Sequence, residues 1–318
     1  MTTQSPLPGG THDCPPDLLD IATDIAVRAA HLAAMTRDRG VRIAAAKSTP
    51  TDIVTEADRA TEAFIRDLLT EERSADGFYG EESGTATSTS GYTWVVDPID
   101  GTVNYAYDLP AWAVSVAVVA HGEQEAYPET WRPVAGVVVN PRLGEVWRAA
   151  TGRGASLARL TVTDRGEEAT PEEAARALTY ELTDHRPLRL EGERALATSL
   201  IATGFAYDPQ VRVTQAEQVL AIIDRCRDIR RFGAASLDLV GVAAGRVDAY
   251  FERGLHPYDH AAGALIAREA GALVWGPGGG RENEDLTVVT HPALAEQLDA
   301  LLKEIGADPT EPLSTRRD

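Results

Sequence analysis

Two aspartates at the end of an apolar run are the residues of this sequence best suited to chemistry. Asp97 and Asp100 lie in the segment Trp94–Asn104, WVVDPIDGTVN, directly after the apolar residues 94–96. Pro98 fixes φ and cannot donate to a sheet ladder, so we expect the strand to end and the chain to turn there. At about 4 Å, two such charges repel by about 4 kcal/mol for an effective dielectric of about 20. The pair therefore favours a cation site, and Mg²⁺ prefers such oxygen ligands.

The two residues that follow these aspartates are suited to binding an anion. Gly101 and Thr102 offer backbone N–H groups at a turn or helix start, and Gly101 has no side chain to obstruct a phosphate oxygen. A metal site and a phosphate site would then be adjacent. The same segment also suits an Asx-type turn in which both aspartates only bond nearby amides, and the segment alone leaves both interpretations open.

Three further carboxylates lie elsewhere in the chain, and each has a simpler interpretation. Glu81 lies beside Glu82 in YGEESG, residues 79–84, and the two glutamates also fit a solvated pair on the surface. Asp259 opens an alanine-rich segment, and Asp58 follows Thr55 by three residues, so each fits a helix cap that contributes about 1 kcal/mol. No single carboxylate here decides the function.

Taken together, these motifs are far more specific than any one of them. In order and spacing they resemble the inositol monophosphatase family of Mg²⁺-dependent, lithium-sensitive phosphatases. The resemblance covers about residues 16–303 and implies an α/β fold, the αβαβα five-layer sandwich of the inositol monophosphatase and fructose-1,6-bisphosphatase type, usually as a homodimer. The motifs that carry it are KSTPTDIVTEAD at 47–58, GEES at 80–83, DPIDGTVN at 97–104, GAASLDLVGVAAGRVDAYFERG at 233–254 and D-x-A-A-G at 259–263.

The resemblance implies a ligand set for two to three Mg²⁺ ions. Glu81, Asp97 and the carbonyl of Ile99 would hold the first ion. Asp97, Asp100 and Asp259 would hold the second, and Glu81 would help to position a third through water.

The resemblance also implies the residues that act on the phosphate. The amides of Gly101 and Thr102 would receive it. The Thr102 hydroxyl and Asp58 would orient and deprotonate the attacking water, with Glu81 counted among the catalytic residues. Lys47 would lie nearby as a supporting charge.

Substrate choice rests on fewer residues. In inositol-cleaving relatives, the glutamate at the position of Glu252 bonds ring hydroxyls, and a small residue, here Ala235, lies beside the ring. Asp100 and Asp259 would also contact the substrate. This implies a polyol monophosphate such as myo-inositol 1-phosphate, although Glu252 alone would fit a surface glutamate at a strand end. Relatives that cleave histidinol phosphate, fructose 1,6-bisphosphate or adenosine 3′,5′-bisphosphate share the metal ligands, so they remain alternatives.

The sequence departs from the family pattern at three places. Tyr258 stands where tryptophan is common, and Tyr105 where phenylalanine is common, so each adds a hydroxyl that needs a partner. The loop over 122–133 is longer than usual and leaves the exact sugar open. A protein of another class, which keeps this fold only to bind a regulatory partner, is the alternative to an enzyme.

Composition excludes several classes of protein. With 30 Lys and Arg against 49 Asp and Glu, the formal charge of −19 repels nucleic-acid phosphates and anionic membranes, so we expect neither as a partner. The two cysteines are too few for a disulfide framework, and the first ten residues do not resemble a signal peptide, which favours the cytoplasm. The apolar run at 112–120 is much shorter than the roughly 20 residues of a membrane helix.

The elements that must position these residues follow from hydrophobic periodicity and turn signals. We expect lobes over about 16–162 and 178–303, joined by the charged stretch 163–177, between flexible tails at 1–15 and 304–318. Predicted helices cover 16–37, 56–73, 214–226, 235–245, 259–270 and 292–305, and predicted strands cover 92–96, 112–120, 134–140, 145–150, 199–205, 246–252, 272–276 and 286–290.

Overall fold

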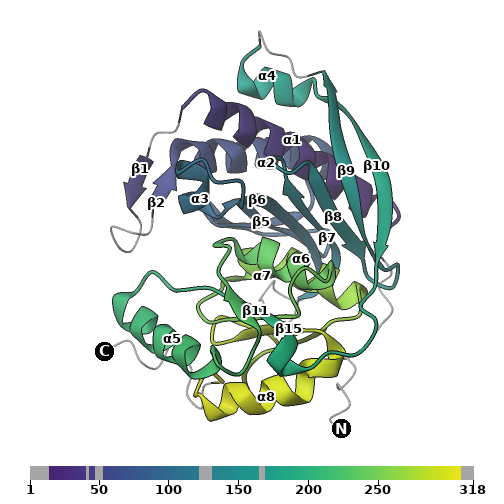
Figure 1. Cartoon of the computed structure of the whole chain (residues 1–318). Coiled ribbons are helices and arrows are strands. Elements are labelled where there is room, and N and C mark those ends of the chain that lie inside the picture. Colours follow the sequence, from purple (N-terminus) through teal and green to yellow (C-terminus); the bar gives the residue numbers. More distant parts are fainter. Residues whose placement is uncertain (1–13, 41–42, 47–52, 122–130, 165–168, 309–318) are drawn as a thin grey trace.

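The structure is a computed structural model that describes residues 14–40, 43–46, 53–121, 131–164 and 169–308. Helices and sheets alternate in five layers (Figure 1), which is the αβαβα arrangement expected from the resemblance. Two sheets form the second and fourth layers. The helical layers are α1 (Leu18–Asp38) with α2 (Glu56–Arg73), then α6 (Ala235–Ala243) with α7 (Pro257–Glu269), then α5 (Pro209–Ile222) with α8 (Ala295–Glu304).

The larger sheet has eight strands in the order β10-β9-β8-β7-β6-β5-β3-β4, and its neighbours are antiparallel except for the parallel pair β3 and β5. Short connections between sequential strands explain this order. Its strands are β3 (Gly77–Gly80), β4 (Gly84–Ala86), β5 (Tyr92–Asp100), β6 (Ala113–Ala120), β7 (Arg132–Asn140), β8 (Glu145–Ala150), β9 (Ala155–Asp164) and β10 (Thr179–Leu188).

The smaller sheet has the order β12-β11-β13-β15-β14, in which β11 runs parallel to both of its neighbours. Its strands are β11 (Leu200–Thr203), β12 (Asp228–Arg230), β13 (Ala249–Glu252), β14 (Leu273–Trp275) and β15 (Thr287–Thr290). The remaining elements are β1 (Ile43–Ala46), β2 (Ile53–Thr55), α3 (Thr102–Ala106), α4 (Pro171–Arg176) and the 3₁₀ turns Leu196–Thr198, Pro277–Gly279 and Pro292–Leu294.

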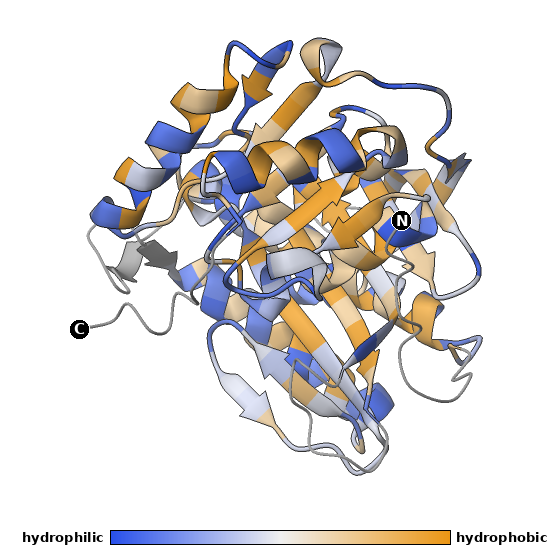
Figure 2. Ribbon diagram, turned by 90° about the horizontal axis from the view of Figure 1, so that it is seen from below, coloured by the Kyte–Doolittle hydropathy of each residue, from blue (hydrophilic) through white to orange (hydrophobic). Residues whose placement is uncertain are grey.

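In the central strands, alternating side chains bury both faces of each sheet. In β5, Trp94 and Val96 pack with α1 and α2, whereas Val95 between them faces the layer of α6 and α7. In β13, Tyr250 faces that same layer and Phe251 faces α5 and α8. Figure 2 shows the strands largely in the hydrophobic colour and the outer helices in alternating colours. Strands covered on both faces are expected to be continuous apolar runs, as β6 is.

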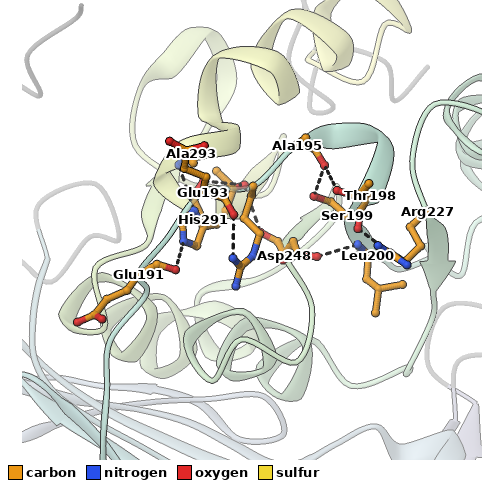
Figure 3. Close-up of polar contacts among 12 residues, drawn as sticks. Glu191, Glu193, Ala195, Thr198, Ser199, Leu200, Arg227, Asp248, His291 and Ala293 are labelled. Atoms are coloured by element: carbon orange, nitrogen blue, oxygen red, sulfur yellow. Dashed lines mark hydrogen bonds and ion pairs between the residues drawn. The ribbon is translucent and has the colours of Figure 1, made fainter.

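The chain crosses from the larger to the smaller sheet over residues 189–199, later than the expected boundary at 163–177. Asp248 anchors this crossing: its carboxylate accepts hydrogen bonds from Leu200 N at 2.9 Å and from Arg194 Nε at 2.8 Å. The His291 ring lies 3.3 Å from the carbonyl of Glu191 (Figure 3). The segment is therefore fixed to the smaller sheet by two half-buried polar contacts and by the exposed one of Arg194.

Most of the predicted elements are confirmed within a few residues, and the main omission is the hairpin β9–β10. These strands pair over almost their whole length, so the described residues of the stretch 163–177 lie at the connection between two neighbouring strands of one sheet. Strand β10, TYELTDHRPL, is mostly exposed and carries charges and a proline. Its sequence therefore lacks the apolar run by which the other strands were predicted. In the part of the chain that is described, no helix combines the length and apolar character needed to cross a bilayer.

Candidate active site

Asp97 and Asp100 lie at the carboxyl end of β5, where the strand is irregular. Pro98 does not end the strand as expected: the pairing with β6 continues to Asp100, with a register shift after Asp97. Asp97 Oδ1 accepts a hydrogen bond from Ile99 N at 3.0 Å, which is the Asx-type contact considered for this segment. The bulge turns Asp97 and Asp100 toward the same point.

The N-terminus of α6 holds the Asp100 carboxylate in place. Oδ1 accepts from Ala235 N at 3.1 Å, and Oδ2 accepts from Ser236 N at 2.7 Å and from the Ser236 hydroxyl. These contacts cross 135 residues of sequence, and they join the end of β5 to the central helical layer. Ala235 thus acts on the site through its backbone.

Gly101 follows in the left-handed conformation, with φ of +90°, and precedes α3. A Cβ at this residue would lie 3.0 Å from the carbonyl oxygen of Ala111 and 3.1 Å from Ala234 Cβ. Glycine is therefore required here by both conformation and space. Its conformation begins the short helix that carries Thr102.

Asp58 lies in the first turn of α2 and is 1% exposed. The expected capping box is present, since Asp58 Oδ2 accepts from Thr55 N at 2.8 Å while Thr55 Oγ1 accepts from Asp58 N at 3.3 Å. The other carboxylate oxygen, Oδ1, lies 3.1 Å from the Thr102 hydroxyl, which also lies 3.1 Å from the carbonyl oxygen of Ile99. Burial raises the pKa of Asp58 to about 6, against the lowering effect of the Thr55 hydrogen bonds.

Asp259 lies in the first turn of α7, which begins at Pro257. Its Oδ2 accepts a hydrogen bond from His256 N at 2.6 Å. Asp97, Asp100 and Asp259 each place one oxygen atom within 4.8 Å of the others. The carboxyl end of one strand and the start of one helix thus bring together side chains that are about 160 residues apart in sequence.

Electrostatics at this cluster favour a bound cation. Burial, followed by the charges of Glu81 and Asp100, raises the pKa of Asp97 well above its ordinary value, and burial with Asp100 and Glu81 does the same for Asp259. Burial raises the pKa of Asp100 to about 6, although the Ser236 and Ala235 hydrogen bonds oppose it. An all-oxygen set of crowded, mostly buried carboxylates fits a hard divalent ion, which would offset this repulsion.

Glu81 is half-buried in the turn between β3 and β4, and its charge acts on Asp97, Asp100 and Asp259. The structure therefore brings Asp97, Asp100 and Asp259 together, and Glu81 lies near enough for its charge to act on all three. Lys47 lies outside the described residues.

Glu252 is half-buried at the end of β13. Tyr250 donates a hydrogen bond from its hydroxyl to Glu252 Oε2 at 2.6 Å, and a Cβ at Gly204 would lie 1.8 Å from that same oxygen. Burial raises the pKa of Glu252 to about 7, opposed by Tyr250 and Arg231. Nearby Asp238 is 1% exposed, and within the described ranges its Oδ1 has no hydrogen-bond partner.

The two tyrosines that depart from the family pattern are both near the site. The Tyr105 hydroxyl donates to the carbonyl oxygen of Ala33 at 2.9 Å, so it has the partner that it needs. Tyr258 packs against Tyr79 with ring centroids 6.2 Å apart, so it keeps an aromatic ring at this position. Of the longer loop at 122–133, residues 122–130 lie outside the described part of the chain.

Sequence reasoning missed Ser236, Tyr250, Gly204 and Glu62 as supporting residues. Glu62 is a buried carboxylate, 1% exposed, and follows Asp58 by four residues on α2. That i, i+4 spacing of two acidic residues on one helix face was a usable signal. Gly204 gave no such signal, because it meets Glu252 only across the sheet, whereas Tyr250 and Glu252 lie two residues apart on β13, where the alternation of a strand puts them on one face.

Comparisons with known proteins identify the family of this chain. A model of the inositol monophosphatase family matches residues 16–307. The inositol-1-monophosphatase of Mycobacterium bovis is 40% identical over 272 residues, which cover 83% of each chain. Nus factor SuhB of Escherichia coli strain K12 is 35% identical over 261 residues, covering 81% of this chain and 84% of the relative. The structure of Mycobacterium tuberculosis SuhB superposes with a TM-score of 0.70 at 35% identity, covering 93% of this chain and 99% of that one.

Proposed function

Because this chain belongs to the inositol monophosphatase family, we propose that it is a phosphatase that hydrolyses a polyol monophosphate, with myo-inositol 1-phosphate as the first candidate substrate. The observation that carries the proposal is the convergence of the Asp97, Asp100 and Asp259 oxygens within 4.8 Å. Histidinol phosphate, fructose 1,6-bisphosphate and adenosine 3′,5′-bisphosphate are the alternative substrates.

The proposed metal is Mg²⁺, two to three ions per site. Glu81, Asp97 and the Ile99 carbonyl would hold one ion, and Asp97, Asp100 and Asp259 another. When bound, such ions neutralise the phosphate charge, lower the pKa of the attacking water and stabilise the leaving oxygen. Hydrolysis of phosphate monoesters is so slow in water that enzymes reach accelerations of up to about 10²¹ for them.

Thr102 and Asp58 are the proposed proton acceptors. A water that donates to Thr102 Oγ1 would give it a proton, while the hydroxyl proton of Thr102 passes to Asp58 Oδ1. Thr102 Oγ1 and Asp58 Oδ1 are 3.1 Å apart. A pKa of about 6 suits this role, because at neutral pH the carboxylate is mostly ionised and still a useful base. The amides of Gly101 and Thr102, at the start of α3, would receive the phosphate oxygens.

Glu252 is the proposed contact to the alcohol part of the substrate, with Ala235 leaving room beside it. A buried or half-buried carboxylate accepts hydrogen bonds from hydroxyl groups, which a polyol offers in number. The charge of Arg231 acts on Glu252, so an acceptor and a cation lie near each other at the end of β13.

A phosphate-release screen tests the proposal. The chain is assayed with the four candidate substrates, with Mg²⁺, with EDTA, and with Mg²⁺ plus Li⁺. We expect Mg²⁺-dependent release that Li⁺ inhibits, highest with inositol 1-phosphate. Asp100→Asn should abolish turnover while circular dichroism stays unchanged, and near-normal turnover in that variant would contradict the assignment.

A partner-binding role is the second candidate, because a relative of 35% identity carries the name Nus factor SuhB. The net charge of −19 argues for a protein partner over direct contact with nucleic acid. A partner that the Asp100→Asn variant binds as tightly as the wild type would establish a role separate from phosphatase activity.

Two further properties are proposed on the same basis. The family resemblance supports a homodimer, which light scattering on the purified chain would test. Cys14 and Cys226 are buried and not bonded to each other, which is compatible with the reducing cytoplasm.

A further inference from the structure

Glu62 is a buried carboxylate to which the proposed mechanism gives no role. It lies on α2, and its two oxygens accept hydrogen bonds from consecutive backbone amides. Oε2 accepts from Glu82 N at 2.8 Å, and Oε1 accepts from Ser83 N at 2.6 Å. Both amides belong to the turn between β3 and β4, immediately after Glu81.

Gly80, the residue before Glu81, lies next to the Glu62 carboxylate. A Cβ at Gly80 would lie 2.5 Å from Glu62 Oε2 and 2.4 Å from Phe78 Cε1. Gly80 therefore leaves the space that the carboxylate occupies. Glu62 thus contacts the turn before Glu81 and after it, and leaves little freedom for the backbone that carries Glu81.

Helix α2 adds weaker contacts to the same turn from its exposed side. Arg66, four residues after Glu62, hydrogen-bonds the Ser83 hydroxyl, and Arg59 Nε lies 3.7 Å from Glu82 Oε2. Arg59 and Ser83 are solvent-exposed and Arg66 is half-buried, so these contacts hold the turn less firmly than the two backbone-amide bonds to the buried Glu62 carboxylate. Of these contacts, those of Glu62 are the ones that can fix the turn.

We propose that Glu62 is a positioning residue that sets the place of Glu81 at the metal site. The proposal rests on the proposed function in one respect, which is that Glu81 binds the metal. When a group that orients a metal ligand without contacting the metal is lost, metal affinity or activity typically falls by about 10- to 100-fold. In this chain, the same helix would carry the proton acceptor Asp58 and hold the turn of a metal ligand.

The test compares Glu62→Gln with Ser83→Ala in the full chain. Glutamine keeps the shape of the side chain but turns one acceptor into an N–H donor, which then faces a backbone N–H. Ser83→Ala removes the Arg66 contact to the same turn and leaves the bond from Ser83 N intact. Isothermal titration after EDTA treatment gives the dissociation constant of Mg²⁺, and unfolding in EDTA reports the metal-free fold.

We expect Glu62→Gln to weaken Mg²⁺ binding by about 10-fold or more, and Ser83→Ala to change it by less than about twofold. Saturating Mg²⁺ should restore most of kcat in Glu62→Gln, since Asp58 and Thr102 are untouched. Gly80→Ala, which displaces the carboxylate without removing it, should weaken Mg²⁺ binding in the same direction and serves if Glu62→Gln does not fold.

Equal Mg²⁺ affinity in the wild type and in a folded Glu62→Gln or Gly80→Ala variant would overturn the proposal. So would a loss of kcat that added Mg²⁺ does not recover. If the wild type binds no Mg²⁺ at all, the proposed metal site itself fails, and this outcome is distinct because it does not depend on any variant.

Discussion

Replacing Gly204 by alanine should change substrate preference without touching the metal site. The new Cβ would lie 1.8 Å from Glu252 Oε2 and 2.1 Å from its Cδ, which is far inside any contact distance. Since the carboxylate is the end of a side chain, we expect Glu252 to move and the hydrogen bond from Tyr250, 2.6 Å long, to break. The main chain of β11 and the Asp97–Asp100–Asp259 cluster should stay in place.

The expected size follows from the bond that is lost. A hydrogen bond from a substrate hydroxyl to a charged acceptor contributes about 1.5–3 kcal/mol. With about 1.4 kcal/mol for each factor of ten, kcat/KM for inositol 1-phosphate should fall by about 10- to 150-fold. Phenyl phosphate has no alcohol hydroxyl for Glu252 to bind, so its kcat/KM should change by less than about threefold.

The assay is phosphate release with both substrates, and Gly241→Ala is the matched control. A Cβ at Gly241 would lie 3.6 Å from Val247 Cγ2, an ordinary contact, so this variant should behave as wild type with both substrates. A Gly204→Ala enzyme whose two kcat/KM values both stay at the wild-type level would refute the role of Glu252. An equal loss with both substrates would show damage to the fold, which thermal unfolding would reveal independently.

Three further predictions concern Asp58, Asp100 and Tyr105. Asp58→Asn should lower kcat by about 10²- to 10⁴-fold and leave the Mg²⁺ affinity nearly unchanged. In the wild type we expect kcat to fall below pH 6, as Asp58 becomes protonated, and the variant should lack this fall. A fall that persists in the variant would contradict the assignment of Asp58 as the base. The folded-state pKa of Asp100, about 6, lies above its ordinary value of 3.8, so in EDTA its contribution to stability is present at low pH and is lost as the pH rises through 6. Mg²⁺ competes with those protons, and the rise in Tm that it causes should therefore be larger at pH 7.5 than at pH 5; equal rises would argue against a carboxylate site. Tyr105→Phe should lower the free energy of unfolding by about 1 kcal/mol in urea, because the buried bond to the Ala33 carbonyl is lost, and an unchanged value would show that water replaces it.

Local signals in the sequence predicted the elements that begin or end sharply. The capping box of Thr55 and Asp58 gave the start of α2 to the residue, and the apolar runs gave β5 to β8. The hairpin β9–β10 was not predictable in the same way, because its stability comes from pairing along its length while its residues stay polar and exposed. The bulge at Pro98 was missed for a related reason: the proline rule excludes a regular strand, and an irregular one satisfies it.

The grouping of the site residues depended on contacts that no local pattern contains. Asp100 is held by Ala235 and Ser236, and Glu252 fits the space at Gly204; both arrangements require the sheets to be in place first. The resemblance to a family predicted that the acidic motifs belong together. It did not predict which side chains hold them there.

For several of these carboxylates, the structural interpretation and the proposed functional one are compatible. The bond to the backbone leaves an oxygen of the same carboxylate in the shared cluster or facing Thr102. Asp58 caps α2 with Oδ2 and presents Oδ1 to Thr102. Asp259 bonds the backbone at the start of α7 with Oδ2, and Asp97 bonds Ile99 N with Oδ1, yet each still places an oxygen in the shared cluster. A capping bond removes the rotational freedom of a carboxylate, so it lowers the entropy cost of gathering like charges at one point. The features that make each aspartate resemble an ordinary cap or turn are therefore the features that orient it for a cation.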